Sequence, residues 1–460
     1  MKVLIIGAGE VGYHLASHLA GERQDVVVLD REPRALKRVQ DELDVQTVLG
    51  SGSNPDHLKA AGIESIRMVI AVTDSDEVNV VACLVATRLA RPGTVRIARI
   101  REESLASAAE KTHPDLLGID RVIHPEKLTA EKIVKLLPIP AACDLLEFEG
   151  GKVQVLGLKV DGSSPLAGKK LHEVPRTSQQ EHDRILYGAI LRHGQVIIPR
   201  GDTTIVPGDT LYAVIRPHQL DVLLRTAAGH PARRVRHVIV AGGTPVASFL
   251  ARSLAASGIK CKMILPDEKL CEAAAAQMNG VVVLHGESTD RNLLEQEFVG
   301  DADAFVGVGR DDEENILSAL LARQLGVARN IVVTRKASYI SLLKVVGVDV
   351  VISPRLVAVS SILGYIRRGR VVQGASLGES AEALEYEVPE HSPLVASPLK
   401  QLSIPRDALI VAVVRQGEPF VPGGKDHIEP GDRVLVFALR SAIPAIENSL
   451  GVRRKRLGER

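Results

Sequence analysis

The stretch MKVLIIGAGEVGYHLASHLA, residues 1–20, joins a short apolar run to an Ala- and Leu-rich run through three glycines. The run Lys2–Ile6 is typical of a buried strand, and the residues after Gly12 are typical of a helix. In this context Gly7 permits a tight turn, Gly9 lets the backbone approach a pyrophosphate, and Gly12 lets helix and strand pack closely. The free N–H groups at the helix N-terminus attract anions. The stretch therefore predicts a dinucleotide-binding strand–turn–helix unit.

The same pattern occurs a second time in the chain. Residues 6–20, IGAGEVGYHLASHLA, align with residues 241–255, AGGTPVASFLARSLA, at a constant offset of 242 − 7 = 235. Residues 71–90, AVTDSDEVNVVACLVATRLA, align with residues 307–326, GVGRDDEENILSALLARQLG. Because the order of the matched segments is kept, the whole nucleotide-binding unit is duplicated.

A second kind of repeat follows each of these units. Residues 189–214, AILRHGQVIIPRGDTTIVPGDTLYAV, resemble residues 412–437, AVVRQGEPFVPGGKDHIEPGDRVLVF, and both contain an Arg, spaced glycines and a Pro-Gly-Asp turn. The chain therefore has an A–B–A′–B′ organisation. We expect Rossmann-like domains at 1–122 and 235–352, and small α+β domains at 140–225 and 372–453.

The expected fold class is α/β. In the first nucleotide unit, Val- and Ile-rich strands alternate with helical stretches, which predicts a parallel sheet covered on both faces. The expected strands are Lys2–Ile6, Asp25–Leu29, Met68–Val72 and Val95–Ile100. The segments 124–140 and 353–369 each contain a helix that opens after a proline and links a nucleotide unit to a small domain.

Composition excludes several classes of protein. Of the 460 residues 45% are hydrophobic and 25% charged, the formal net charge is +1, and aromatic residues make up 3% with no Trp. This balance argues against nucleic acid as a partner and against base-stacking platforms. The four cysteines have no CxxC spacing, which favours a reducing, cytoplasmic compartment. No run reaches the ~18 apolar residues that span a bilayer.

Asp30 closes the strand Asp25–Leu29 at the distance of about 20 residues that the motif expects. Its carboxylate can bind both ribose hydroxyls and repels a 2′-phosphate, so we expect NAD(H) rather than NADP(H). Glu10 lies beside the phosphates and disfavours a third phosphate, which weighs against ATP as the preferred ligand. ATP and ADP remain candidate competitors at the same site.

Later segments complete the predicted pocket, because ligands bind at the carboxyl ends of parallel strands. Ser51 and Gly52 follow the third strand and can border the adenine, and Thr73 and Asp74 end the fourth. Arg99 ends the fifth strand and either neutralises a phosphate or forms a surface ion pair. The full candidate set is Gly7, Ala8, Gly9, Glu10, Val11, Asp30, Ser51, Gly52, Thr73, Asp74 and Arg99.

The second nucleotide unit has lost key residues. Thr244 and Ala247 stand where Gly9 and Gly12 would be, and Leu265 takes the place of Asp30. Arg335 aligns with Arg99, and Arg310 replaces Asp74. We expect this half, with Gly242 and Gly243 in its loop, to be structural or to bind a different ligand more weakly.

Catalytic constellations are not evident. His14 and His18 lie one helical turn apart, but no HExxH motif or third ligand accompanies them, so neither a metal nor a catalytic residue is predicted. The sequence has no GxSxG elbow and no P-loop.

Taken together, the segments KVLIIGAGEVG, GSGSNPDHLKAAGI, AVTDSDEVNVVACLVA and IARIR, with the terminal Asp30 and the paired PGD motifs, resemble the TrkA family over essentially the whole chain. These are regulatory subunits of bacterial Trk potassium-uptake systems, built from RCK/KTN domains. The resemblance implies a non-catalytic protein that binds NAD(H) in its first nucleotide domain. It also implies a homo-oligomeric, tetrameric ring on the inner face of the cell membrane, beneath a membrane-embedded Trk-type potassium transporter subunit.

Two alternatives stay open at this point. One is an NAD-dependent oxidoreductase with an unrecognised substrate domain, and the other is a regulatory subunit of another ion transporter or antiporter.

Overall fold

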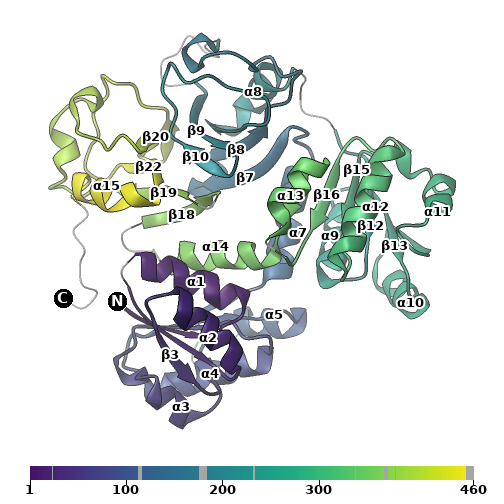
Figure 1. Ribbon diagram of the computed structural model, residues 1–460, viewed down its shortest axis with the longest axis horizontal. Helices are drawn as coiled ribbons and strands as arrows, with labels where there is room; N and C mark the ends of the chain where they lie inside the picture. Colours follow the sequence, from purple (N-terminus) through teal and green to yellow (C-terminus); the bar gives the residue numbers. More distant parts are fainter. Residues whose placement is uncertain are drawn as a thin grey trace. The chain divides into compact units, whose positions relative to one another are not determined.

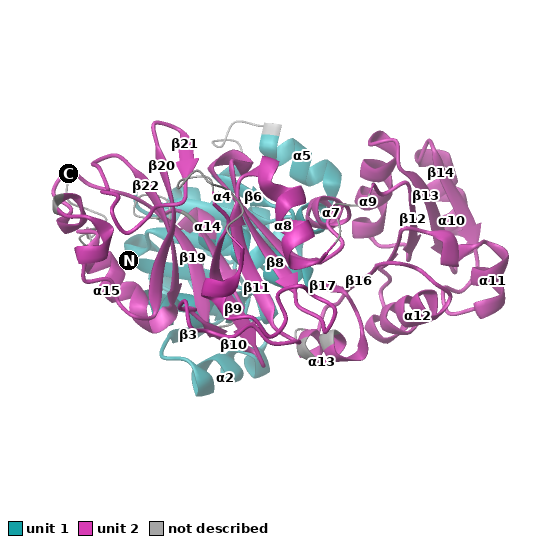
Figure 2. Cartoon of the chain, turned by 90° about the horizontal axis from the view of Figure 1, so that it is seen from above, with its two compact units in different colours: residues 1–129, 353–363, 455–460 teal, residues 130–352, 364–454 magenta. Residues whose placement is uncertain are grey.

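The computed structural model describes residues 1–22, 24–111, 117–175, 184–229, 231, 234–336, 338–366, 371–378 and 380–451 (Figure 1). These residues divide into two compact units (Figure 2). Of the described residues, unit 1 comprises those in 1–129 and 353–363, and unit 2 comprises those in 130–352 and 364–451.

Unit 1 contains a parallel, six-stranded sheet in the order β3-β2-β1-β4-β5-β6. Its strands are β1 (Lys2–Ile6), β2 (Asp25–Asp30), β3 (Gln46–Leu49), β4 (Met68–Ala71), β5 (Val95–Arg99) and β6 (Arg121–Ile123). Its helices are α1 (Glu10–Gly21), α2 (Pro33–Glu42), α3 (Pro55–Ala60), α4 (Asp76–Leu89) and α5 (Glu103–Lys111). The strand order reverses between β1 and β4, so the β1–α1 loop lies at the position where such sheets bind ligands.

Unit 2 contains a second parallel sheet with the same topology, β14-β13-β12-β15-β16-β17. Its strands are β12 (His237–Ala241), β13 (Lys260–Leu265), β14 (Val281–His285), β15 (Ala304–Gly307), β16 (Asn330–Val333) and β17 (Val350–Ile352). Its helices are α9 (Pro245–Ala256), α10 (Glu268–Gln277), α11 (Arg291–Gln296), α12 (Asp312–Gln324) and α13 (Tyr339–Val346). The predicted duplication is therefore present in the fold as well as in the sequence.

Two antiparallel sheets complete unit 2, in the equivalent orders β10-β9-β11-β8-β7 and β21-β20-β22-β19-β18. The first contains β7 (Ala142–Phe148), β8 (Val153–Lys159), β9 (Leu186–Arg192), β10 (Gln195–Ile197) and β11 (Thr210–Ile215), followed by α8 (Leu220–Ala227). The second contains β18 (Val371–Leu377), β19 (Ala381–Glu387), β20 (Ala408–Arg415), β21 (Glu418–Phe420) and β22 (Arg433–Leu439), followed by α15 (Ile443–Ser449). The predicted fold class, two Rossmann-like sheets each followed by a small α+β unit, is confirmed.

The Arg and Pro-Gly-Asp landmarks of the small domains form ion pairs in which the Asp carboxylate is buried and the Arg side chain is partly exposed. Asp209 accepts two hydrogen bonds from the Arg192 guanidinium, at 2.7 and 2.8 Å, and a third from the Val206 amide at 2.9 Å. Asp432 binds Arg415 in the same manner, at 2.9 and 2.8 Å. Each pair joins the turn before a central strand to the end of a neighbouring strand, so these repeated residues are structural.

The two small sheets share one apolar core. Phe148, Val155 and Tyr212 of the first sheet pack in the same buried cluster as Val411 and Phe437 of the second. Such a shared core ties the two small domains together, since burial of apolar surface stabilises by roughly 25 cal/mol per Å².

Two helices connect the parallel sheets to the small domains, as predicted from the two proline-led segments. They are α7 (Pro125–Leu136), which follows β6, and α14 (Pro354–Ile366), which follows β17. Both begin in unit 1.

Candidate functional site

Three glycines shape the loop between β1 and α1. Gly7 has φ +111°, a backbone conformation that favours glycine, and its N–H donates to the Leu29 carbonyl at 2.8 Å. A Cβ on Gly12 would lie 1.7 Å from the Gly7 oxygen, so α1 can approach the loop only without a side chain there. A Cβ on Gly9 would meet nothing within 4 Å, and Gly9 is the N-cap of α1. The loop therefore leaves open space at the helix N-terminus, as a pyrophosphate requires.

Asp30 lies at the end of β2 and faces this loop. Its carboxylate accepts a hydrogen bond from the backbone N–H of Ala8 at 2.5 Å and another from the backbone N–H of Glu32 at 2.8 Å. Asp30 is thereby held beside the glycine turn, where the motif places a ribose. The loop and the acid together fit a dinucleotide without 2′-phosphate.

Glu10 opens α1 and is flanked by basic side chains. Its carboxylate accepts a hydrogen bond from Arg38 at 2.8 Å and lies 3.6 Å from His14 Nε2. Partial burial alone would raise the pKa of Glu10, but the hydrogen bond and charge of Arg38 lower it below the ordinary value. Glu10 is therefore ionised at neutral pH, beside the open end of the helix. Val11 follows it and is buried.

The Gly50–Ser53 loop follows β3 and is closed by a residue that the sequence analysis did not identify. His57 Nδ1 accepts a hydrogen bond from the backbone N–H of Ser51 at 2.9 Å. A Cβ on Gly50 would lie 2.6 Å from the His57 ring, so the ring packs against a residue that must be glycine. A Cβ on Gly52 would lie 2.3 Å from Ile6 Cγ2. This loop therefore packs directly on the end of β1.

Asn79, also missed as a site residue, joins the ends of β4 and β5. Its Oδ1 accepts hydrogen bonds from the backbone N–H of Thr73 at 2.9 Å and from the Thr73 hydroxyl at 2.7 Å. Its Nδ2 donates to the carbonyls of Thr73 and Arg99, at 3.1 and 2.9 Å. The side chain is fully buried. Its recurrence as Asn315 in the second half was the signal that could have identified it.

Arg99 is the one strongly buried cation of the predicted set. Its side chain is 12% exposed, and its Nε has no hydrogen-bond partner among the described residues. Burial lowers the pKa of Arg99, and the charge of Glu126 opposes that effect. A buried guanidinium with an unpaired donor is suited to an anion. Arg99 also lies 3.5 Å from the exposed carboxylate of Asp74, so an ion pair is present and the phosphate role stays a prediction.

Asp74 differs from the other predicted residues. Its carboxylate lies 3.5 Å from Arg99 Nη1, but its side chain is 93% exposed. Its backbone carbonyl accepts from Arg101. Asp74 is therefore at the edge of the site.

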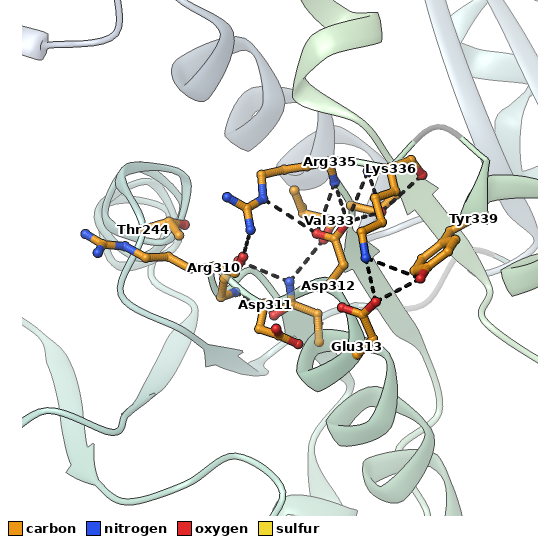
Figure 3. A network of polar contacts seen from close by, with 12 residues as sticks. Thr244, Arg310, Asp311, Asp312, Glu313, Val333, Arg335, Lys336 and Tyr339 are labelled. Carbon is orange, nitrogen blue, oxygen red and sulfur yellow. Dashed lines mark hydrogen bonds and ion pairs between the residues drawn. The ribbon is translucent and has the colours of Figure 1, made fainter. Parts of the chain in front are cut away.

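The second parallel sheet corrects one alignment. Asn315 donates to the Val333 carbonyl, as Asn79 does to Arg99, so Val333 and not Arg335 occupies the Arg99 position. Arg335 instead matches Arg101, because each donates to the equivalent loop carbonyl, Arg310 in this half (Figure 3). The offset is 312 − 76 = 236 at the start of the helix and 333 − 99 = 234 at the end of the following strand, because the stretch from the start of α12 to the end of β16 is two residues shorter than that from α4 to β5.

The other substitutions in the second half are consistent with loss of a dinucleotide site. The Thr244 hydroxyl donates to the Val308 carbonyl at 2.6 Å, where Gly9 leaves open space in the first half. Leu265 ends β13 at the Asp30 position, and Asp267 caps α10 by accepting the Leu270 amide. The carboxyl ends of β15 and β16 carry an internal ion-pair network, in which Lys336 binds Glu313 at 2.6 Å (Figure 3).

The four cysteines are free thiols. No helix in the described part of the chain is long and apolar enough to cross a membrane. Within the same residues, no group of three or more His, Cys, Asp or Glu side chains is arranged to hold a metal ion.

Comparison with known proteins identifies the domains. The TrkA-N domain matches residues 3–125 and 238–354, and the TrkA-C domain matches residues 155–228 and 383–451. Among solved structures, this fold is similar to a crystal structure of the GsuK RCK domain, with TM-score 0.59 and 19% identity, covering 98% of this chain and 95% of that chain. A structure described as the GsuK channel bound to NAD has TM-score 0.59 and 19% identity, over 98% of this chain and 79% of the other.

Curated relatives extend over nearly the whole chain. The Trk system potassium uptake protein TrkA of Halomonas elongata is 34% identical over 443 residues, 95% of this chain and 96% of that protein. The protein of the same name from Azorhizobium caulinodans is 35% identical over 452 residues, 97% of this chain and 98% of that protein. With both domain types matched in duplicate and in the same order, this chain belongs to the TrkA family of Trk-system potassium uptake proteins.

Proposed function

We propose that this chain is a non-catalytic regulatory subunit that binds NAD(H) in its first Rossmann-like domain and gates potassium flux through a membrane-embedded Trk-type transporter subunit. It acts at the cytoplasmic face of the membrane as a homo-oligomeric, tetrameric ring. The family membership supports the potassium-uptake role, and the structure of the similar GsuK channel bound to NAD supports the choice of cofactor.

One observation carries the nucleotide part of the proposal. Asp30, held 2.5 Å from the Ala8 amide, faces a helix N-terminus whose Gly9 leaves open space, and Arg99 supplies a buried guanidinium with an unpaired donor. Ribose, pyrophosphate and charge neutralisation are thus each matched by a residue. NAD, when bound, supplies two phosphates and two riboses to these groups.

The proposed mechanism is a population shift. NAD(H) stabilises one arrangement of the subunits in the ring, and the linker helices α7 and α14 carry the change to the transporter. A ligand can shift such an equilibrium only by its differential affinity for the two states, typically about 1–3 kcal/mol.

Titration of the purified protein with NADH, NAD⁺, ATP and ADP tests the site, using NADH fluorescence and competition. Asp30→Ala removes the ribose acceptor and should weaken NADH binding by about tenfold or more. Potassium uptake in cells carrying Asp30→Ala should lose its response to the NADH/NAD⁺ ratio. Uptake that ignores the substitution contradicts the gating role, and turnover of NADH with a carbonyl substrate would support the oxidoreductase alternative.

A further inference from the structure

The first turn of α14 is the counterpart of the first turn of α7. His124-Pro125-Glu126 opens α7 after β6, and Ser353-Pro354-Arg355 opens α14 after β17, at an offset of 353 − 124 = 229. Both helices begin at the proline. The third residue of each triplet is charged, but the sign is opposite, Glu126 in the first half and Arg355 in the second.

The start of α14 belongs to the compact unit of the first Rossmann-like domain, although it follows the second one in the sequence. Residues 353–363 belong to unit 1 together with residues 1–129, whereas the second parallel sheet lies in unit 2 (Figure 2). Arg355 is half-buried there. A residue from the second half of the chain is thus part of the unit that holds the candidate nucleotide site.

The charge of Arg355 acts on two residues of that site. Burial raises the pKa of Glu10, Arg38 lowers it, and Arg355 adds a smaller lowering; burial is the main cause that lowers the pKa of Arg99, and Arg355 adds to it. Glu10 opens α1 and Arg99 ends β5, two elements of the same parallel-sheet domain, so a cation that acts on both lies in this unit beside the carboxyl ends of its strands. Arg355 is attracted to Glu10 and repelled by Arg99.

The charges around the loop therefore favour an anion between the two arginines. The facing groups are Glu10 and Arg38 from α1 and α2, Asp74 after β4, Arg99 on β5, Glu126 on α7 and Arg355 on α14. Arg99 keeps an unpaired Nε donor although Asp74 and Glu126 are both near. A diphosphate group relieves the repulsion between Arg99 and Arg355 and can accept from both guanidinium groups.

We propose that Arg355 is a ligand of the dinucleotide's pyrophosphate, supplied to the first nucleotide domain by the helix that follows the second. This deepens the proposed function and rests on it. Because α14 is the stretch of chain that leads from unit 1 back to unit 2, a phosphate bound by Arg355 stabilises the docked position of its first turn. The contact thus links occupancy of the site to a helix outside the nucleotide-binding motif.

The test uses the full-length protein and three variants. Arg355→Met keeps side-chain length without the charge, Arg355→Lys keeps the charge, and Arg335→Ala removes an exposed arginine from the second half as a matched control. NADH is titrated by its fluorescence, and adenosine, which lacks phosphate, is titrated by calorimetry.

Loss of one charge-assisted hydrogen bond predicts NADH binding weakened by about tenfold or more in Arg355→Met. Arg355→Lys should recover part of that affinity, and Arg335→Ala should bind as the wild type does. Adenosine affinity should be unchanged in all three. NADH should also slow backbone hydrogen exchange in residues 354–360 of the wild type, but not of Arg355→Met.

Two results overturn the assignment. NADH affinity within twofold of wild type in Arg355→Met, or an equal loss for adenosine and NADH, shows that Arg355 does not bind the phosphates. If Asp30→Ala still weakens NADH binding in that case, the proposed nucleotide site stands without Arg355. A wild-type protein that binds no NADH instead removes the proposed site itself.

Discussion

Gly9 and Gly12 lie three residues apart in one motif but should respond oppositely to the same substitution. A Cβ on Gly12 would lie 1.7 Å from the Gly7 oxygen and 2.8 Å from its carbonyl carbon. A Cβ on Gly9 would meet nothing within 4 Å, and the φ of Gly9, −67°, is open to any residue. Gly12→Ala should therefore damage the fold, and Gly9→Ala should damage binding alone.

The magnitude for Gly12→Ala follows from the clash. To reach a Cβ contact of 3.0 Å, α1 must move by 3.0 − 1.7 = 1.3 Å relative to the Gly7 carbonyl. Overpacking typically costs about 1–3 kcal/mol, and a clash with rigid backbone belongs at the upper end, about 3 kcal/mol. For a domain of this size, that corresponds to a decrease in Tm of about 10 °C. Gly9→Ala should leave Tm unchanged or slightly raised, because alanine restricts the unfolded chain.

Differential scanning calorimetry and NADH titration of both variants check this pair. Gly9→Ala is expected to melt with the wild type and to bind NADH about tenfold more weakly or worse, since its Cβ occupies the space a pyrophosphate needs. Equal stability of Gly12→Ala and wild type would refute the reasoning on packing. Unchanged NADH affinity in Gly9→Ala would refute the inference that the pyrophosphate occupies the open space beside Gly9.

Burial and the neighbouring Glu149 raise the pKa of Glu385 from 4.5 to about 8. The folded chain thus keeps a proton that the unfolded chain releases, so stability should fall as pH rises from about 4.5 to 8, by up to about 1.4 kcal/mol per unit. Glu385→Gln should flatten this slope in urea unfolding, and an unchanged slope would contradict it. Arg329 is buried and donates to the Ile139 and Ala142 carbonyls. Arg329→Met should cost about 3 kcal/mol in the same assay, and a loss below about 1 would count against these bonds.

Sequence patterns were most informative at positions where the backbone conformation or packing restricts the residue type. The positive φ of Gly7, the close approach at Gly12 and the position of Asp30 at the end of β2 are local consequences of a strand–turn–helix unit. Each restricts which residue can occupy one position, so the restriction is visible in a single chain.

The roles of single polar side chains were not predictable in the same manner. Asn79 joins β4 to β5 and His57 closes the Gly50 loop, but a histidine or an asparagine inside a helical segment does not by itself show which backbone groups it will bind. The alignment of Arg335 with Arg99 was wrong because the second half is two residues shorter before the end of β16. The similarity between the two halves is still recognisable there, but each residue is matched two positions away from its structural counterpart.

By itself, the amino-acid sequence determined the duplication, the alternation of strand and helix, and the glycine–acid signature of the first domain. These depend on periodicity and on backbone sterics within about 30 residues. Only the tertiary structure decided that the start of α14, with Arg355, belongs to the compact unit of the first domain. The physical reason is that packing between distant segments is selected by complementary surfaces and charges, which no local pattern records.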